Sequence, residues 1–199
     1  VSLFMGVQME EGKKYDSVAD ITEVNGKLAY RAREGDKEFV VYGGQEQKKY
    51  DAIKKYSITE INNKLTYEAI QGDKQFIVYD GEEQKKYDLK YTFDLIGIDD
   101  KIAYKVRKSS RMRMGKKFVV YNSEEQKKYD EGCGIRAITG VSNKLAYRVK
   151  CNNKQFIVYD GKKQKEYAIA AGLDEFNGKL FYLARSKKRG KIFIVYNGE

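Results

Sequence analysis

Cationic and aromatic side chains are the residues of this chain whose types and spacing suggest binding chemistry. The sequence contains 39 Lys and Arg against 29 Asp and Glu, which gives a formal net charge of +10, and it contains no His. The absence of His excludes His-based catalytic triads and zinc sites with His ligands, and it removes the commonest general base. The excess of cations favours an anionic partner instead.

The cations and aromatics fall into a recurring group and a group that varies. One pattern, NGKLAYRAREGDKEFVVYGGQEQKKYD at 25–51, returns from Asn62, Asp99, Ser142 and Asn177, so the chain is a repeat protein with five copies. Most of its lysines recur in each copy, at turns or on an edge strand, where lysine discourages edge-to-edge aggregation. Residues that recur in every copy serve the repeat, and residues that differ between copies can serve a ligand.

The varying cations and aromatics define the predicted partner face. It consists of Lys54, Lys55, Tyr56, Lys90, Tyr91, Phe93, Arg111, Arg113, Arg136, Lys187, Lys188 and Arg189. Lys108, Lys116 and Lys150 belong to the same non-recurring cations. Aromatic rings of this kind can act as stacking or hot-spot residues, and the cations suit an acidic protein, a sulfated or uronic glycan, or nucleic acid. The alternatives are that the rings pack under their own loops or plug a channel, and that the cations are a solvated surface.

Each copy reads as four short strands with no helical spacing. In the first copy they are 20–24, 28–32, 39–42 and 47–50, with Asn25-Gly26 as a two-residue hairpin signal. Four antiparallel strands of this length, repeated, describe a β-propeller blade. Fifteen of the seventeen tyrosines occupy three repeat positions, which favours core packing with the hydroxyl satisfied.

The two ends of the chain predict how the ring closes. The last copy stops at VYNGE, and residues 9–16 supply the missing lysine-rich strand, so that the joined ends match 78–88. The predicted fold is therefore an all-β, five-bladed β-propeller of four-stranded antiparallel blades, closed by the N-terminal strand completing the C-terminal blade. We expect one domain over 1–199 and a monomer. The expected blades are 15–49, 50–86, 87–128, 129–166, and 167–199 plus 7–14.

These motifs resemble the bacterial WD40-like repeats of the TolB type. The segment Asn25-Gly26-Lys27-Leu28-Ala29-Tyr30 and its copies are similar to the turn and strand core of that family, and Phe39-Val40-Val41-Tyr42 is similar to the strand that follows. The resemblance covers nearly the whole chain. It implies that the varying strand is innermost around the channel and the lysine-rich strand outermost, and it implies no particular activity.

Carboxylates on the innermost strands offer the main catalytic alternative. Asp20, Glu23, Glu60, Asp94, Asp174 and Glu175 are the residues concerned. A polysaccharide-acting glycoside hydrolase would need two of them roughly 5–10 Å apart. Glu23, Glu60 and Glu175 share one repeat position, which favours a role at the strand end. No phosphate-binding glycine loop or metal-ligand cluster is present, so no cofactor and no metal are predicted.

The remaining features set the class of protein. No apolar run reaches the length of a membrane span, and two cysteines, Cys133 and Cys151, are too few for a disulfide scaffold and are expected to be free thiols. The sequence leaves the compartment open. We predict a non-catalytic binding or scaffold propeller, with a hydrolase, or a structural module of a longer protein, as the alternatives.

Overall fold

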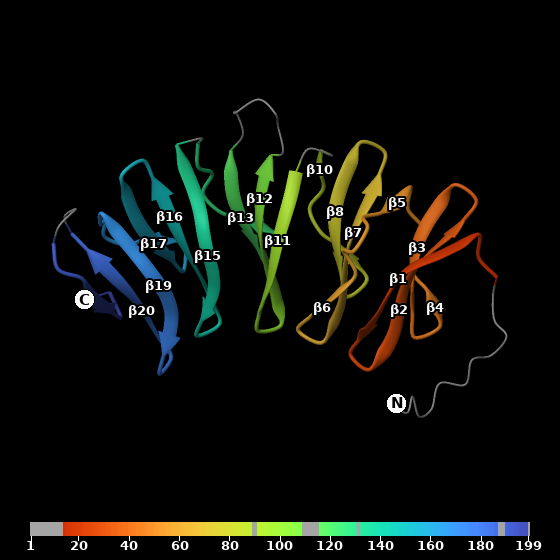
Figure 1. The fold of residues 1–199 in the computed structure, drawn as a ribbon, viewed down its shortest axis with the longest axis horizontal. Coiled ribbons are helices and arrows are strands. Elements are labelled where there is room, and N and C mark those ends of the chain that lie inside the picture. Colours follow the sequence, from red (N-terminus) through yellow and green to blue (C-terminus); the bar gives the residue numbers. More distant parts are fainter. Residues whose placement is uncertain (1–13, 89–90, 109–115, 131, 187–189, 199) are drawn as a thin grey trace.

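The protein consists of five antiparallel β-sheets placed side by side along an arc, as a computed structural model shows (Figure 1). The structure describes residues 14–88, 91–108, 116–130, 132–186 and 190–198. Each sheet contains one copy of the repeat, so the order of the sheets along the arc follows the chain. Within these ranges no helix is long and apolar enough to cross a membrane.

Strands follow one another in chain order across each sheet. The first sheet contains β1 (Ser17–Val24), β2 (Lys27–Glu34), β3 (Lys37–Tyr42) and β4 (Gln45–Glu46). The second contains β5 (Ala52–Ile53), β6 (Thr59–Ile61), β7 (Lys64–Gln71), β8 (Lys74–Tyr79), β9 (Glu82–Glu83) and β10 (Tyr87–Asp88). The third contains β11 (Tyr91–Ile98), β12 (Lys101–Lys108), β13 (Lys117–Tyr121) and β14 (Glu124–Glu125).

The last two sheets repeat the same order. The fourth contains β15 (Cys133–Val141), β16 (Lys144–Cys151), β17 (Lys154–Tyr159) and β18 (Lys162–Lys163), and the fifth contains β19 (Ile169–Phe176), β20 (Lys179–Arg185) and β21 (Phe193–Tyr196). In the second sheet both edge strands are divided, because β5 and β6 both pair with β7, and β9 and β10 both pair with β8. The first strands lie in contact between the first and second sheets, between the third and fourth and between the fourth and fifth. We call the line of β1, β5, β6, β11, β15 and β19 the first-strand edge.

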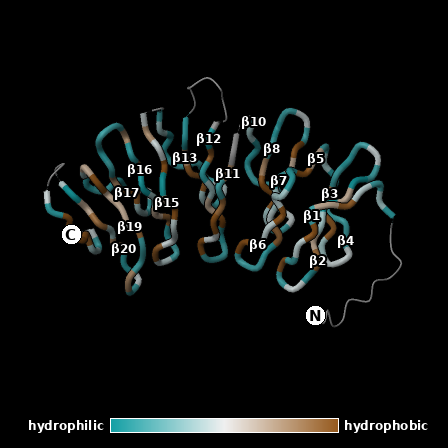
Figure 2. Tube along the Cα trace, viewed as in Figure 1, coloured by the Kyte–Doolittle hydropathy of each residue, from teal (hydrophilic) through white to brown (hydrophobic). Residues whose placement is uncertain are grey.

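Turn residues at the ends of the strands fit the backbone that the hairpins need. Asn25 and Gly26 join β1 to β2 with φ values of 45° and 70°, in the left-handed region that Asn and Gly tolerate best. Hydrophobic residues lie along the strands and hydrophilic residues at the turns (Figure 2). The predicted hairpins are therefore confirmed at this turn.

The hydrophobic core lies between sheets rather than within one. Val24, Ala29 and Val40 of the first sheet form one cluster with Leu65 and Tyr67 of the second, among others. Three further clusters join the second sheet to the third, the third to the fourth and the fourth to the fifth in the same way. Each internal sheet thus has one face toward the preceding sheet and another toward the following one. We call these the leading face and the trailing face.

A tyrosine from the link between two sheets fills each of these interfaces. Tyr50 follows the first sheet, and its ring makes edge contacts with Tyr67 and Phe76 of the second, with centroids 6.4 and 5.5 Å apart. The same place is taken by Tyr87, Tyr129 and Tyr167 on the next three sheets, and by Tyr15 on the first. Burial raises the pKa of Tyr67 to about 12, so this hydroxyl stays neutral at any pH at which the protein is studied. The prediction that the recurring tyrosines are core residues is confirmed at these positions.

The predicted propeller agrees with the structure in its coarse features. Five antiparallel sheets of the expected order are present, although the described part of the fifth sheet has three strands. The first and fifth sheets lie at opposite ends of the arc (Figure 1). Most of the segment predicted to close the ring, residues 7–14, lies outside the described residues. Closure of the ring within one chain therefore stays a prediction.

The two cysteines form a disulfide, so the expectation of two free thiols is wrong. Cys133 and Cys151 lie directly opposite each other at the ends of β15 and β16, with their Cα atoms 4.0 Å apart. The expectation rested on the small number of cysteines and did not consider how far the first strand of the fourth sheet extends. In the structure it begins at Cys133, which extends the ladder far enough to bring the two sulfur atoms together.

We expect Glu83→Gln to lower the free energy of unfolding at pH 7 by about 1–2 kcal/mol, after discounting for solvent screening. Lys48 of the preceding sheet, at 2.6 Å, then Lys86 and the Tyr50 hydroxyl, hold the pKa of Glu83 down at about 2. A lowered pKa in the folded state stabilises the protein above the ordinary value of 4.5, and that stabilisation is lost as the pH falls toward 2.

Urea unfolding of the wild type, Glu83→Gln and the control Glu82→Gln between pH 7 and pH 3 measures this effect. Glu82 is the exposed neighbour of Glu83 and should tolerate the change at every pH. The difference between wild type and Glu83→Gln should shrink as the solution is acidified. A difference that is absent at pH 7, or that stays constant down to pH 3, contradicts the assigned role of Glu83.

Candidate functional site

A turn that interrupts the first-strand edge of the second sheet presents three of the predicted face residues together. Lys54, Lys55 and Tyr56 lie between β5 and β6, and all three are exposed. The turn is closed by the Ser57 amide, which donates to the Lys54 carbonyl at 3.3 Å, and by the Ser57 hydroxyl, which donates to the same oxygen at 2.7 Å. Other sheets have a bulge near this place, where Asp20, Ala137 and Gly172 also have positive φ.

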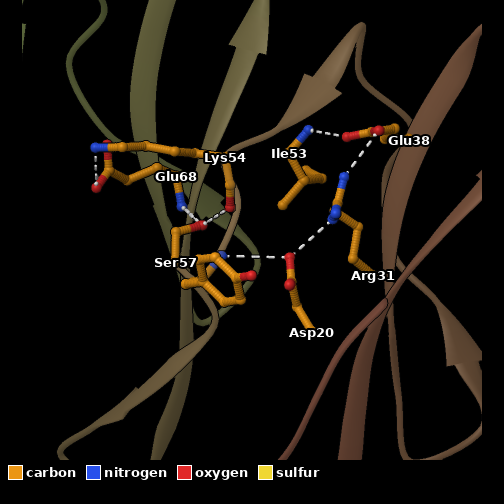
Figure 3. Close-up of polar contacts among 8 residues, drawn as sticks. Asp20, Arg31, Glu38, Ile53, Lys54, Ser57 and Glu68 are labelled. Carbon is orange, nitrogen blue, oxygen red and sulfur yellow. Dashed lines mark hydrogen bonds and ion pairs between the residues drawn. The ribbon is translucent and has the colours of Figure 1, made fainter. Parts of the chain in front are cut away.

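A chain of charged contacts between the first and second sheets holds the turn in place (Figure 3). The Arg31 guanidinium donates to the carboxylates of Asp20 and Glu38, each at 2.9 Å, and the side chains of Arg31 and Asp20 are largely buried. The other Glu38 oxygen accepts from the Ile53 amide at 2.8 Å, at the start of the turn. Asp20 in turn accepts from the Tyr56 amide at 3.3 Å. The first sheet therefore holds the turn by hydrogen bonds to two backbone amides, those of Ile53 and Tyr56.

The second sheet anchors the opposite side of the same turn. The Lys54 ammonium contacts the Glu68 carboxylate at 2.8 Å, and the Glu68 amide donates to the Ser57 hydroxyl at 3.1 Å (Figure 3). Because Glu68 neutralises Lys54, this lysine adds little positive potential to the surface. Lys55 is the cation of the turn that remains available to a ligand, since it has no ion pair within the described residues.

Tyr56 is the most exposed large apolar side chain among the described residues, at 88%. Its backbone has φ of 57°, a conformation that costs a non-glycine residue of this size about 1–3 kcal/mol. An exposed ring gains little from burial to offset this cost. The side chain is thus held at an unfavourable backbone position by Asp20 and the surrounding contacts, in an orientation that leaves its ring open to solvent.

The other predicted face residues have different outcomes. Phe93 is buried in the core between the third sheet and its neighbour, where its ring contacts Tyr87 and Tyr104, so its assignment to an exposed face is wrong. The repeat pattern did not predict the burial of Phe93, because the corresponding residues of the other copies are smaller. Arg136 is exposed on β15. Lys90, Arg111, Arg113, Lys187, Lys188 and Arg189 lie outside the described residues, as does the side chain of Tyr91.

A cavity of about 410 Å³ lies between the fourth and fifth sheets, beside the β16–β17 hairpin. Its lining consists of two cations, three amide side chains and an alanine, namely Lys150, Asn152, Asn153, Gln155, Ala168 and Arg185. Among the described residues, the lining contains no carboxylate. Arg185 is partly buried, and its Nε atom has no hydrogen-bond partner within the described structure. Its two cationic residues are of the type that pairs with carboxylate, sulfate or phosphate groups, while most of its accessible lining surface is apolar.

Lys150 and Arg185 come together because they occupy one repeat position on neighbouring sheets. Both lie at or near the end of the second strand, where the other sheets have Arg33, Ile70 and Arg107. Four of the five copies thus place a cation at the same end of their sheet, and these four cations form a row along the arc. Sequence reasoning identified Lys150 but missed Arg185 and the amides. The recurrence of cations at this position was the signal that could have found Arg185.

Four of the six carboxylates considered for hydrolysis, namely Asp20, Asp94, Glu60 and Glu175, are engaged in contacts between or within sheets. Asp20 pairs with Arg31 and Asp94 with Lys105. Glu60 accepts from the Asn25 amide of the preceding sheet at 2.5 Å, and Glu175 accepts from the Ser142 amide at 2.7 Å. These contacts favour the structural role that the shared repeat position of Glu60 and Glu175 predicted.

Comparisons with known proteins identify no family for this chain. No family model matches the chain, and no curated protein matches its sequence. Among solved structures, one match is a crystal structure of BBS1N in complex with ARL6DN, soaked with mercury. The two chains are 12% identical, the alignment covers 91% of this chain and 66% of that one, and the TM-score is 0.35. At this level of similarity the match carries no argument about the fold, the partners or the activity of this chain.

We expect Asp20→Asn to loosen the turn that carries Tyr56. The substitution keeps the size of the side chain but removes the charge that faces Arg31, so the amides of Ile53 and Tyr56 should exchange hydrogen faster. The free energy of unfolding should fall by about 1–3 kcal/mol. Hydrogen exchange followed by NMR measures the effect, with the exposed hairpin variant Asp36→Asn as the control. Unchanged protection of the Tyr56 amide in Asp20→Asn contradicts the proposed support.

Proposed function

We propose that the protein is a non-catalytic binding or scaffold module that takes an anionic group of its partner into the cavity between the fourth and fifth sheets. The observation that carries the proposal is the lining of that cavity, which includes Lys150 and Arg185 and, among the described residues, no carboxylate. The Arg185 Nε atom is buried and has no hydrogen-bond partner within the described structure, so no carboxylate there holds this atom. Hydrogen bonds between two charged groups are roughly twice as strong as neutral ones.

The row of cations supports a partner that is longer than one anionic group. Arg107 and Lys150 occupy the same repeat position on consecutive sheets, and Arg185 follows on the fifth. Lys187, Lys188 and Arg189, which belong to the predicted partner face, come two to four residues after Arg185 in the chain. An acidic protein segment, a sulfated or uronic glycan or a nucleic-acid strand would each offer several anionic groups along such a row.

The turn at Lys54–Ser57 is the second contact of the proposed binding module. An exposed aromatic ring at a backbone position that disfavours it is a candidate for function rather than stability. Tyr56 is such a ring, and Lys55 lies beside it in the chain. Tyrosine is enriched among the residues that dominate binding energy at protein interfaces. Lys90, Tyr91, Arg111, Arg113 and Arg136 remain part of the proposed face.

We expect Arg185→Ala and Lys150→Ala each to weaken binding of an anionic probe about 5–20-fold, which corresponds to about 1–2 kcal/mol. Fluorescence anisotropy with a labelled oligo-glutamate peptide, a heparin oligosaccharide and a single-stranded oligonucleotide measures the affinities at 50 and 200 mM salt. The probe with the largest loss identifies the class of partner. Tyr56→Gly, which relieves the backbone strain, should weaken binding without lowering the melting temperature.

Lys162→Ala on β18 is the matched control, because it removes one exposed positive charge at the edge of the fourth sheet away from the cavity lining. It should change each affinity less than twofold. If Lys162→Ala weakens binding as much as Arg185→Ala does, the probes respond to net charge alone, and the cavity is not the binding site. If no probe distinguishes Arg185→Ala from the wild type, the proposal is likewise overturned.

A further inference from the structure

At the two ends of the arc, hydrophobic residues are exposed at repeat positions that are buried in the other sheets. On the leading face of the first sheet, Leu28 is 43% exposed, whereas Leu65, Ile102, Leu145 and Leu180 at its position are 2–4% exposed. Val18 and Ile21 are exposed on the same face. Each internal leading face is covered by the sheet before it. The first sheet therefore presents a leading face that has no described sheet against it.

The fifth sheet has an exposed trailing face at the other end of the arc. Ile194 is 64% exposed on its trailing face, whereas Val40, Ile77, Val119 and Ile157 at its position are 0–1% exposed. Phe176 and Tyr196 are exposed on this face as well. The trailing face of the fifth sheet is also more apolar than its counterparts. Leu183 and Ile192 stand where the first sheet has Arg31 and Glu38.

We propose that these two end faces bind each other between two copies of this chain, head to tail, so that the fifth sheet of one copy packs on the first sheet of the next. Within one molecule the two faces lie at opposite ends of the arc (Figure 1). Bringing them together in one chain would require all four internal interfaces to rearrange. One head-to-tail contact covers one end face of each copy with the internal interfaces unchanged, and a closed assembly of copies covers both. Every copy of the chain carries the two matching faces.

Polar groups at the two ends match the pattern of an internal interface. At two internal junctions a glutamate accepts from the turn amide of the preceding sheet, as Glu60 does from Asn25. Glu23 occupies this position on the first sheet, is exposed, and has no such partner within the described ranges. The fifth sheet ends its first strand with Asn177-Gly178, the same residue types as Asn25-Gly26. Glu23 of one copy would thus accept from the Asn177 amide of the other.

A second polar pair follows the same logic. The hydroxyls of Tyr79 and Tyr121 donate to the carbonyls of Asp100 and Asn143, in the turn of the following sheet, at 3.1 and 3.0 Å. Tyr196 is the corresponding tyrosine of the fifth sheet and is exposed. Its hydroxyl would donate to the Gly26 carbonyl of the next copy.

Tyr15 supplies the aromatic contact of the same interface. It already packs on Tyr30 and Phe39 of the first sheet and donates to Glu46 at 3.2 Å, as Tyr50 does to Glu83 on the second sheet. The equivalent tyrosines Tyr50, Tyr129 and Tyr167 also bridge to the preceding sheet, at Glu38, Lys117 and Gln155. Ile192 holds that position on the fifth sheet. Tyr15 of one copy would therefore pair with Ile192 of the other.

Sedimentation velocity of the wild type and of two charged variants tests the proposal. The wild type should have twice its mass of 23.0 kDa, or more if the assembly continues. Leu28→Glu and Ile194→Glu each place a charge on one end face, at a position exposed within one copy, and should each sediment as a single chain. Tyr56→Glu replaces an exposed ring that lies on neither end face and should assemble like the wild type.

Mixing the two monomeric variants gives the deciding result. Leu28→Glu keeps an intact fifth sheet and Ile194→Glu keeps an intact first sheet, so an equimolar mixture should form a species of two chains. Pairing of like faces, or closure of the ring within one chain, cannot restore assembly on mixing. A wild type of 23.0 kDa, or a mixture that stays monomeric, overturns the proposal. Circular dichroism of the variants confirms that each copy is folded.

Discussion

The insertion of a link tyrosine into the next sheet is the interaction on which the rest of this structure depends. Each sheet is only three or four strands wide, and the four larger core clusters of the described residues each join two neighbouring sheets. Tyr50, Tyr87, Tyr129 and Tyr167 each contact a tyrosine or phenylalanine of the sheet that follows, and the aliphatic clusters surround these rings. An aromatic side chain buries roughly 150–250 Å², so each link tyrosine contributes strongly to the stability of its junction. The molecule is therefore a series of similar interfaces rather than one central core.

The same arrangement explains where the candidate site lies. Residues that pack the interfaces recur in every copy, because a change of residue type there would disturb the packing between sheets. The variation is concentrated at hairpins and on the first-strand edge, where Tyr56, Arg136 and the Lys150–Arg185 cavity are found. The cavity lies between two sheets, which means that the spacing set by the interface also sets the distance between its two cations. Stability and binding are thus linked through the same junctions.

The sequence predicted the repeated elements well because they follow simple rules. Alternating apolar residues and Asn-Gly turns placed the second and third strands, and the recurrence of tyrosine marked the core. The predictions failed where a single copy departs from the repeat pattern. Cys133 joined a strand because β15 is longer than the corresponding strand of the pattern, and Phe93 filled a core position that is smaller elsewhere. The Lys150–Arg185 cavity depends on how two sheets sit against each other, a distance that no pattern within one copy contains.

Equilibrium unfolding of Tyr87→Leu measures the central claim most directly, because this ring lies at the junction between the second and third sheets. If the interfaces hold the sheets together, the variant should lose roughly 2–4 kcal/mol. Native-state hydrogen exchange should then show the first two sheets opening independently of the last three. A loss below about 0.5 kcal/mol with uniform exchange across all five sheets would contradict the claim that link tyrosines carry the cohesion of the arc.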